Sequence, residues 1–375
     1  MKKGKNDKKP MVSSIPGLRK SIDKIDDEIL ELISKRLLCV KEIGEIKKEK
    51  GDPVLDISRE KTIMDRLLSK NRGELDNKSL QYIFKEIIAA SRELQSPQRI
   101  TYLGPEATFT HMAAMSHFGR SAYYVPRSNI RDIFGEVEKG ACHYGVVPVE
   151  NSIEGSINYT LDLFFESELK ICAEIYQAIS HDLLSVTGEL DSIKVIYSHP
   201  HVFPQCRKWL RKYLPEVKLE ECSSTAQAAR KAAGDRDSAA IAGREAAHMY
   251  NLQVVASKIE DVGRNITRFL VIGTDKVHRT GKDKTSIMFA TPHVPGALYQ
   301  VLKPIAESDI NMVKLESRPT KHENWSYFFF VDIEGHIEDK IIVEAVSKLK
   351  EICLYLKVLG SYIMTQEGFN RGIES

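Results

Sequence analysis

Charged side chains interrupt the apolar face of a long helix predicted near the N-terminus. The stripe that includes Leu32 continues, at spacings of three and four residues, through Arg36, Val40, Ile43 and Lys47. Eleven residues separate Arg36 from Lys47, which is about three helical turns, so the two side chains share one face. An unpaired buried charge is very costly. The pattern therefore predicts a polar pocket that holds an anionic ligand.

The two helices predicted next also carry polar residues on their stripes. Arg59 and Glu60 precede the stripe of the second helix, and the stripe of the third ends in Ser91 and Gln95. Each of these residues, taken alone, is more simply explained as a surface charge on a poorly phased helix or as part of an internal salt bridge. Because all three stripes show the pattern, we favour a polar pocket inside a helical bundle.

Residues 15–96 resemble the all-helical chorismate mutase family position by position. The segment Leu18-Arg19-Lys20-Ser21 resembles the opening helix, which supplies an arginine in that family. The resemblance implies an intertwined dimer in which Arg19 reaches the site of the partner. It also implies a substrate-binding set, which comprises Arg19, Arg36, Lys47, Asp56, Arg59, Glu60, Ser91 and Gln95.

The rearrangement of chorismate needs neither a nucleophile nor a metal, because the dianion only has to be held in its reactive conformer. Arginines of the set would bind the carboxylates. We expect Lys47 and Gln95 to donate hydrogen bonds to the ether oxygen, which gains negative charge in the transition state. Glu60 and Ser91 are expected to bind the ring hydroxyl. The predicted catalytic residues of this first site are Lys47, Gln95 and Glu60.

Four short stretches in the next part of the chain are predicted at strand ends or on loops, where α/β sheets bind ligands. They are residues 102–111, 147–156, 197–206 and 265–272. Singly, each has a structural explanation: Gly104-Pro105 is turn chemistry, and Thr267 is a β-former at a strand start. His199 and His201 have the spacing of a metal-binding pair, but no third ligand accompanies them, so no metal is expected.

In this order and spacing, the four stretches resemble the prephenate dehydratase family over nearly all of residues 98–275. The resemblance implies two α/β lobes like those of periplasmic binding proteins, with the active site in the cleft between them. It assigns the central role to Thr267. Our candidate for the proton donor is Glu150, and Arg268 is expected to bind a substrate carboxylate. The predicted substrate-binding set of the cleft is Asn151, Ser152, Ser198, Gln205, Thr267, Arg268 and Phe269.

Residues 284–364 show the order strand, helix, strand, strand, helix, strand, which is the α+β ferredoxin-like arrangement. The segments Pro295-Gly296-Ala297-Leu298 and Leu315-Glu316-Ser317-Arg318-Pro319 resemble two motifs of the ACT regulatory domain in phenylalanine-regulated dehydratases. The resemblance implies a phenylalanine pocket at a dimer interface. Its expected effector-binding residues are Gly296, Ala297, Leu298, Glu316, Ser317, Arg318 and Pro319.

The elements that must position these residues divide the chain into three parts after a basic tail. Residues 15–96 have helical periodicity throughout, with one long helix and two shorter ones, which predicts an all-α part. Residues 98–275 alternate short apolar strands with helices, which is typical of α/β architecture. A polar stretch precedes the third part, residues 284–364. Residues 1–14 are rich in lysine and are expected to form a disordered tail.

The composition fits a multidomain protein and excludes several classes. The chain has 375 residues, of which 42% are hydrophobic and 28% charged, and a formal net charge of +2. This small charge gives no reason to expect a nucleic-acid partner, and no apolar run indicates a membrane segment. The six cysteines form no C-x-x-C pair, which argues against a metal site or a disulfide framework and favours a reduced, cytoplasmic compartment.

Together these features predict a bifunctional enzyme of phenylalanine biosynthesis that needs no cofactor. It would rearrange chorismate to prephenate and then decarboxylate and dehydrate prephenate to phenylpyruvate. Inhibition by L-phenylalanine and a homodimer or larger homo-oligomer are expected. Two alternatives stay open. The dehydratase could prefer arogenate, the transaminated relative of prephenate, or the chain could be a phenylalanine-binding regulator whose cleft has no activity.

Overall fold

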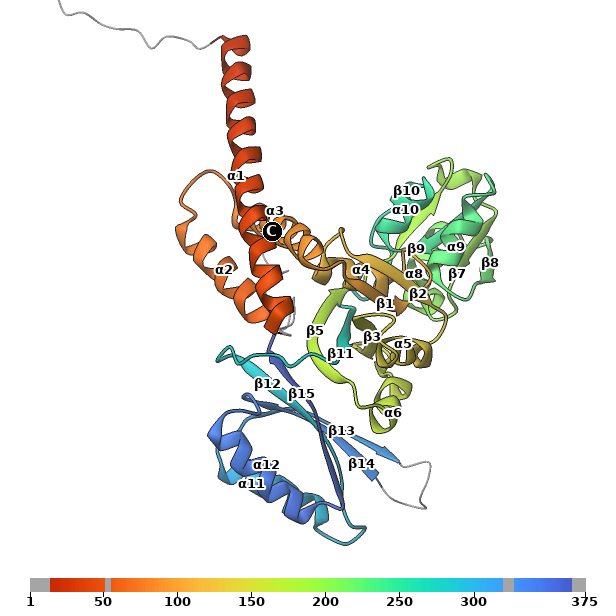
Figure 1. Cartoon of the computed structure of the whole chain (residues 1–375). Helices are drawn as coiled ribbons and strands as arrows, with labels where there is room; N and C mark the ends of the chain where they lie inside the picture. The colour runs from red at the N-terminus through yellow and green to blue at the C-terminus, as the bar shows by residue number, and fades with distance from the viewer. Residues whose placement is uncertain (1–13, 51–54, 320–326, 366–375) are drawn as a thin grey trace, which may run out of the picture.

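The structure is a computed structural model that describes residues 14–50, 55–319 and 327–365 (Figure 1). Residues 1–13, which make up nearly all of the predicted basic tail, lie outside the described residues. The described residues form a helical part, two α/β lobes and a C-terminal α+β part. Within them, no helix is both long and apolar enough to cross a membrane.

The one long and two shorter helices expected from the periodicity are present: α1 (Ile15–Lys50), α2 (Ile57–Lys70) and α3 (Asn77–Gln95). Asp56 caps α2 and Asp76 caps α3, because each side chain accepts hydrogen bonds from N–H groups of the first turn. The N-terminal half of α1 projects away from α2 and α3 (Figure 1). Within α1, all of which the structure describes, Val40 alone is buried. The exposed part of its apolar stripe is Ile22, Ile25, Ile29 and Leu32.

The first lobe is a sheet with the strand order β2-β1-β3-β11-β5, and the short β4 pairs with β3. β1 is parallel to β2 and β3, whereas β11 is antiparallel to β3 and β5. The elements are β1 (Arg99–Leu103), α4 (Phe109–Phe118), β2 (Tyr123–Arg127), α5 (Ile130–Glu138), β3 (Tyr144–Asn151), β4 (Gly155–Ser156), α6 (Asn158–Glu166), β5 (Lys170–Ala178) and β11 (Ile266–Gly273).

The second lobe is inserted between β5 and β11 of the first, so two connections join the lobes. Its sheet has the order β10-β6-β9-β7-β8. Helix α9 packs on this sheet through alanines, which allow a close approach. The elements are β6 (Asp182–Ser185), η1 (Leu190–Ser192), β7 (Val195–Ser198), α7 (Val202–Gln205), α8 (Arg207–Tyr213), β8 (Lys218–Glu221), α9 (Thr225–Ala232), β9 (Ser238–Ala242), α10 (Arg244–Tyr250) and β10 (Gln253–Ala256).

The C-terminal part is an antiparallel sheet of order β13-β14-β12-β15, with two helices on one face (Figure 1). Its chain order is strand, helix, strand, strand, helix, strand, as the sequence predicts. Apolar residues of β12 and β14 meet those of both helices in one core. The elements are β12 (Asp283–Ala290), α11 (Ala297–Glu307), β13 (Met312–Pro319), β14 (Tyr327–Glu334), α12 (Lys340–Ile352) and β15 (Tyr355–Ile363).

The face of the C-terminal sheet that carries no helix lies against the first lobe. A Cβ atom added at Gly360 of β15 would lie only 2.3 Å from the carbonyl oxygen of Ile171 in β5. Glycine is therefore required for this close approach. Lys170 donates from Nζ to the carbonyl oxygen of Val358 at 2.9 Å, which adds a polar contact between the same two strands.

The pairing of β3 with β11 creates two faces of different composition. Thr267 lies opposite Asn151, and Arg268 lies opposite Glu150. Successive residues of a strand point to opposite sides of the sheet. We therefore call the side with Thr267 and Asn151 the front face, and the side with Arg268 and Glu150 the rear face. The register shifts after Arg268, but the two opposed pairs lie before this irregularity.

Candidate active sites

A cleft of about 360 Å³ opens between the two lobes on the front face of β3 and β11. The first lobe contributes Thr108, Asn151 and Thr267, and the second contributes Gln205 and residues at the start of α9. The cleft lies where the carboxyl end of β1 leads into α4, which is a usual position for a ligand in α/β proteins. Of the described residues that line it, none is lysine or arginine.

A continuous chain of hydrogen bonds crosses this cleft from one lobe to the other. Asn151 Nδ2 donates to Thr267 Oγ1 at 2.8 Å and to Asn265 Oδ1 at 2.7 Å. Asn265 Nδ2 donates to Gln205 Oε1 at 3.0 Å, and Gln205 Nε2 lies 3.4 Å from Glu154 Oε1. Because each amide is fixed by its neighbour, the chain holds the Thr267 hydroxyl in one place.

Three histidines line the cleft beside this chain. His181 is buried, and Nε2 of its ring lies 3.1 Å from Gln205 Oε1. Burial lowers the pKa of His181, so the neutral ring donates from Nε2 to the amide oxygen. Burial likewise lowers the pKa of His199. His201 is exposed and places Nδ1 at 3.1 Å from Glu154 Oε1. Glu154 and His201 are thus a titratable pair that faces the cleft.

Two helix N-termini meet at the cleft, one from each lobe. Thr108 Oγ1 accepts from His111 N at 3.3 Å at the start of α4, and Ser224 Oγ accepts from Gln227 N at 3.0 Å at the start of α9. Thr225 also lines the cleft. Free N–H groups and the helix dipole at such ends favour anions. Together they give the cleft a means of holding carboxylates with uncharged groups.

The predicted dehydratase residues divide between the two faces. Thr267, Asn151, Gln205 and Phe269 line the cleft. Ser198 is buried at the end of β7, where its Oγ donates to the carbonyl oxygen of Ile241 at 2.8 Å.

Three of the predicted dehydratase residues lie behind the sheet. Ser152, Glu150 and Arg268 line a second cavity of about 310 Å³, between the first lobe and the C-terminal sheet. Since a strand alternates its side chains, Arg268 cannot share the face of Thr267, nor Glu150 that of Asn151. The structure thus places Arg268 and Glu150 behind the sheet, whereas the sequence predicted that both act in the cleft.

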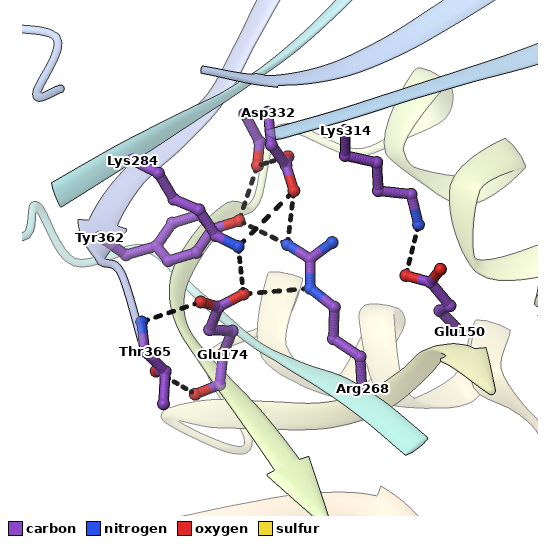
Figure 2. Close-up of polar contacts among 9 residues, drawn as sticks. Glu150, Glu174, Arg268, Lys284, Lys314, Asp332, Tyr362 and Thr365 are labelled. Atoms are coloured by element: carbon purple, nitrogen blue, oxygen red, sulfur yellow. Dashed lines mark hydrogen bonds and ion pairs between the residues drawn. The ribbon is translucent and has the colours of Figure 1, made fainter. Parts of the chain in front are cut away.

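The rear face holds a buried cluster of ion pairs that joins two parts of the molecule (Figure 2). Arg268 Nε donates to Glu174 Oε2 at 3.0 Å, and its Nη2 donates to Asp332 Oδ2 at 2.7 Å and to Tyr362 at 3.0 Å. Lys284 Nζ lies 2.5 Å from Glu174 Oε2. Arg268 and Glu174 belong to the first lobe, whereas Lys284, Asp332 and Tyr362 belong to the C-terminal sheet.

The charges of this cluster balance, with two cations and two carboxylates. All four side chains are less than a tenth exposed. Burial alone would raise the pKa of Asp332, but the positive charges of Arg268 and Lys284 outweigh it and keep that pKa below its ordinary value. The cluster therefore stays ionised. Glu150 forms a separate ion pair, with its Oε2 at 2.6 Å from Lys314 Nζ of β13 (Figure 2).

A second polar site lies where α1, α2 and α3 meet. Arg36 Nη1 of α1 donates to Ser91 Oγ of α3. Gly44 lies so close to Gln95 that an added Cβ would be 2.9 Å from its Cγ, so α1 and α3 touch here. The Oε1 atom of Gln95 is buried without a hydrogen-bond partner among the described residues. Such an unsatisfied atom is unusual in a folded protein and is consistent with a ligand position.

Glu60 of α2 faces the same site. Its pKa is raised because burial disfavours the ionised form, although the charge of Arg92 opposes this effect. The carboxylate lies 3.4 Å from Arg92 Nη1, and the charge of Lys47 also acts on it. The structure thus brings together Arg36, Lys47, Glu60, Ser91 and Gln95.

Two predicted mutase residues, Arg19 and Arg59, lie elsewhere, whereas the charge of Asp56 acts on Glu60. Arg19 is on the projecting half of α1 and is exposed, and Arg59 is exposed at the start of α2. Asp56 caps α2 by accepting from Arg59 N at 2.8 Å. In this single chain, the site therefore lacks the arginine that the resemblance places in it from a partner.

Sequence reasoning did not identify several residues that the structure places at these sites. Arg92 is buried and donates to the carbonyl oxygen of Phe118 at 2.8 Å, in the first lobe. Its role depends on a contact between distant segments, which no local pattern reveals. His181 lies in no predicted motif, and Asn265 begins the stretch 265–272 but was not singled out as a site residue. Thr108 could have been found, because an N-cap residue that follows a strand in an α/β unit marks an anion site.

Comparison with known proteins gives a consistent result for each part. Family models match residues 18–96 as chorismate mutase type II, residues 100–277 as prephenate dehydratase and residues 285–351 as ACT domain. A bifunctional chorismate mutase/prephenate dehydratase from Aquifex aeolicus is 47% identical over 349 residues, which span 92% of this chain and 96% of that protein. The chain belongs to the family of bifunctional chorismate mutase/prephenate dehydratases.

Solved structures agree with this family. A prephenate dehydratase from Arthrobacter aurescens in complex with L-Phe is 35% identical, with a TM-score of 0.66, and the match covers 71% of this chain and 90% of that one. A protein described as a quorum-quenching acylase, GqqA, has the same TM-score of 0.66 at 25% identity, covering 73% of this chain and 99% of that one. Since two reactions are named for one fold, the function must be argued from the site.

Proposed function

We propose that this chain converts chorismate to prephenate in its helical part and prephenate to phenylpyruvate in the cleft, under inhibition by L-phenylalanine. The observation that carries the second activity is the hydrogen-bond chain that fixes Thr267 in the cleft. We further propose that the parts correspond to domains at residues 15–96, 98–275 and 284–364, with a periplasmic-binding-protein-like pair of lobes and a ferredoxin-like C-terminal domain.

In the helical site, catalysis is by positioning and electrostatics. Chorismate carries two carboxylates, and Arg36 can bind one of them bidentately. Lys47 and Gln95 donate to the ether oxygen as it gains charge. Glu60, whose raised pKa favours the protonated form more than usual, can share a proton with that oxygen or bind the ring hydroxyl with Ser91.

The arginine for the other carboxylate comes from a second copy of the chain in this proposal. The residues of the exposed stripe of α1, among them Ile22 and Ile29, are 49–64% exposed in the single chain. An apolar helical face of this length is typical of an interface, because burial stabilises it at about 25 cal/mol per Å². A partner helix on this stripe would place Arg19 near the partner's site, as the resemblance implies.

In the cleft, prephenate must lose carbon dioxide and hydroxide, and the hydroxide leaves only if a proton reaches it. Because Asn151 Nδ2 donates to Thr267 Oγ1, the hydroxyl hydrogen of Thr267 is free to point at the leaving oxygen. The titratable pair Glu154 and His201 belongs to the same hydrogen-bonded system. We assign the supply of the proton to this pair, in place of Glu150.

The two carboxylates of prephenate are held by uncharged groups in this proposal. The N-termini of α4 and α9 approach from opposite lobes, and each offers N–H groups. At α9 the Ser224 hydroxyl can donate as well, whereas the Thr108 hydroxyl donates to the carbonyl oxygen of Leu103 at 3.0 Å. Binding to both ends would draw the lobes together. Water would then be excluded from the reacting ring, which strengthens the hydrogen bonds within the cleft.

Regulation by phenylalanine is proposed from the ACT domain and from the relative crystallised with L-Phe. The predicted effector residues lie at the start of α11, from Gly296 to Leu298, and along β13, from Glu316 to Pro319. β13 is an edge strand, and its Leu315 and Ser317 are exposed on one side. That side is open to a second copy of the chain. A cytoplasmic location stays a prediction from the sequence.

One experiment tests the assignment against its alternatives. Pure protein is incubated separately with chorismate, prephenate and arogenate, and phenylpyruvate and phenylalanine are measured. Phenylpyruvate from the first two substrates is expected. Phenylalanine formed preferentially from arogenate would show the arogenate-preferring enzyme. No turnover of any substrate, with phenylalanine still bound, would show a regulator.

A further inference from the structure

The edge strand β13 has two sides with different contacts. Lys314, Glu316 and Arg318 are partly buried, whereas the residues between them are exposed. Lys314 Nζ lies 2.6 Å from Glu150 Oε2, and Arg318 Nη2 lies 3.7 Å from Asp162 Oδ1 of α6. The inner side of β13 therefore contacts the first lobe, while Leu315 and Ser317 on its outer side are exposed among the described residues.

Glu150 stands one residue from the cleft. It precedes Asn151, whose side chain holds the Thr267 hydroxyl, and the pairs Glu150–Arg268 and Asn151–Thr267 are adjacent rungs of the same ladder. A displacement of the Glu150 backbone toward or away from β13 would therefore also move the backbone of Asn151. Because the Asn151 amide bonds Thr267 directly, the move would change the position of the reacting hydroxyl.

The Glu150–Lys314 pair differs from the Arg268 cluster beside it. Glu150 is 39% exposed and Lys314 18%, and both line the rear cavity of about 310 Å³. Water in this cavity can solvate either group if the pair opens. The Arg268 cluster, by contrast, is less than a tenth exposed and has no such alternative. The solvent-accessible ion pair between Glu150 and Lys314 can therefore break and re-form, whereas the ion pairs of the buried Arg268 cluster stay formed.

We propose that Glu150 is a positioning residue for the dehydratase, and that its ion pair with Lys314 transmits the state of β13 to Asn151 and Thr267. Phenylalanine bound beside β13 shifts this strand, the pair changes, and the Thr267 hydroxyl leaves its active position. The inference rests on the proposed function, since it takes dehydratase activity and phenylalanine binding as given. It adds the route between the two sites.

The test uses the full-length chain and the variant Lys314→Gln, which removes the charge from a residue outside both catalytic sites. At saturating phenylalanine, with binding verified by calorimetry, the residual dehydratase rate is expected to rise at least about fivefold over wild type, the low end of ordinary allosteric coupling. The mutase rate reports folding and should be unchanged. Lys340→Gln, at an exposed ion pair with Glu344 on α12, is the charge-matched control and should be inhibited like wild type.

A double variant separates transmission from a general loosening. If Glu150 and Lys314 act as a pair, the second substitution should add nothing to the first. The double variant Glu150→Gln with Lys314→Gln should therefore be inhibited by phenylalanine at least as strongly as either single variant. Normal inhibition of Lys314→Gln, additive effects in the double variant, or loss of phenylalanine binding by Lys314→Gln would each overturn the inference. A wild-type chain without phenylpyruvate formation or without inhibition would instead contradict the proposed function.

Discussion

The front and rear faces of the β3–β11 pair carry polar residues of opposite kinds. The front has amides and a hydroxyl, from Asn151 and Thr267, and it opens into the cleft. The rear has full charges, including Arg268 and Glu174, buried against the C-terminal sheet. Residue type alone would have placed the arginine with an anionic substrate.

The difference follows from the source of the charges at each face: a bound ligand at the front, and the protein itself at the rear. The substrate brings its own carboxylates into the cleft, where uncharged groups can donate hydrogen bonds to them. When the cleft is empty, these uncharged donors leave no unpaired charge buried. The C-terminal sheet always covers the rear face, so opposite charges can neutralise one another there permanently. A buried ion pair of this kind is a poor source of net stability, but it is costly to break. It therefore fixes which surfaces of the two parts meet.

The largest effect is expected on the front face. Thr267→Ala removes the hydroxyl that we propose donates to the leaving group, and the dehydratase kcat should fall about 10²–10⁴-fold. Thr267→Ser keeps the hydroxyl and should retain most of the rate. The mutase rate of both variants serves as the folding control. A rate near wild type in Thr267→Ala would remove the basis for assigning the chemistry to the front face.

On the rear face, loss of stability should exceed loss of rate. Arg268→Met leaves Glu174 and Asp332 with one cation between them, and the free energy of unfolding should drop by about 3–5 kcal/mol. Urea denaturation measures it. Arg131→Met, which breaks the exposed pair with Glu166, is the matched control and should cost about 1 kcal/mol or less. Equal losses of unfolding free energy in the two variants would mean that the buried cluster does not hold the first lobe and the C-terminal sheet together.

Two glutamates four residues apart test the division between faces directly. Glu154→Gln removes the carboxylate in the cleft, and we expect the dehydratase rate without phenylalanine to fall about 10²-fold. Glu150 lies behind the sheet, so Glu150→Gln should keep the dehydratase rate without phenylalanine within about threefold of wild type. The reverse order of effects would return the proton donor to Glu150, as the sequence predicted.

A smaller effect is expected from pH. Burial lowers the pKa of His181, so the folded chain takes up this proton only at a lower pH than the unfolded chain, whose histidines titrate near about 6.5. The contribution of His181 to the free energy of unfolding is complete above the histidine pKa of the unfolded chain. It is lost as pH falls below this pKa, by up to about 1.4 kcal/mol per pH unit. Asp332 has a lowered pKa and loses its contribution only at more acidic pH.

His181→Gln checks the sign. It keeps a donor for Gln205 but cannot titrate, so its unfolding free energy should depend less on pH between 7 and 5 than that of wild type. The measurement is urea denaturation at several pH values in this range. An equal slope in both proteins would show that His181 is not the group responsible.

The sequence predicted much of the fold because the periodic signals are local. The helices from Ile15 to Gln95 follow from an apolar repeat, and the order of strands and helices along the chain in the C-terminal part follows from short apolar runs between turns. A polar pocket with Arg36, Ser91 and Gln95 was predicted in the same way, because a polar residue on an apolar stripe is visible without the partner helix.

The residues that failed to lie where expected share a physical reason. Thr267 and Arg268 were placed in one cleft, although neighbours on a strand face opposite ways. The family motif groups them because both matter, but it does not say on which face. Arg92 was missed because its partners, Glu60 and the Phe118 carbonyl, come from other elements. Contacts between distant segments leave no periodic signal.

The insertion of the second lobe also sets an order of events during synthesis. β11 lies between β3 and β5, yet 266 − 178 = 88 residues separate its first residue from the end of β5. At about 5–20 residues per second, the ribosome needs roughly 4–18 s to supply it. During that time β3 and β5 wait with unpaired edges, which are aggregation-prone. The nascent first lobe thus exposes two strand edges to aggregation until its central strand emerges.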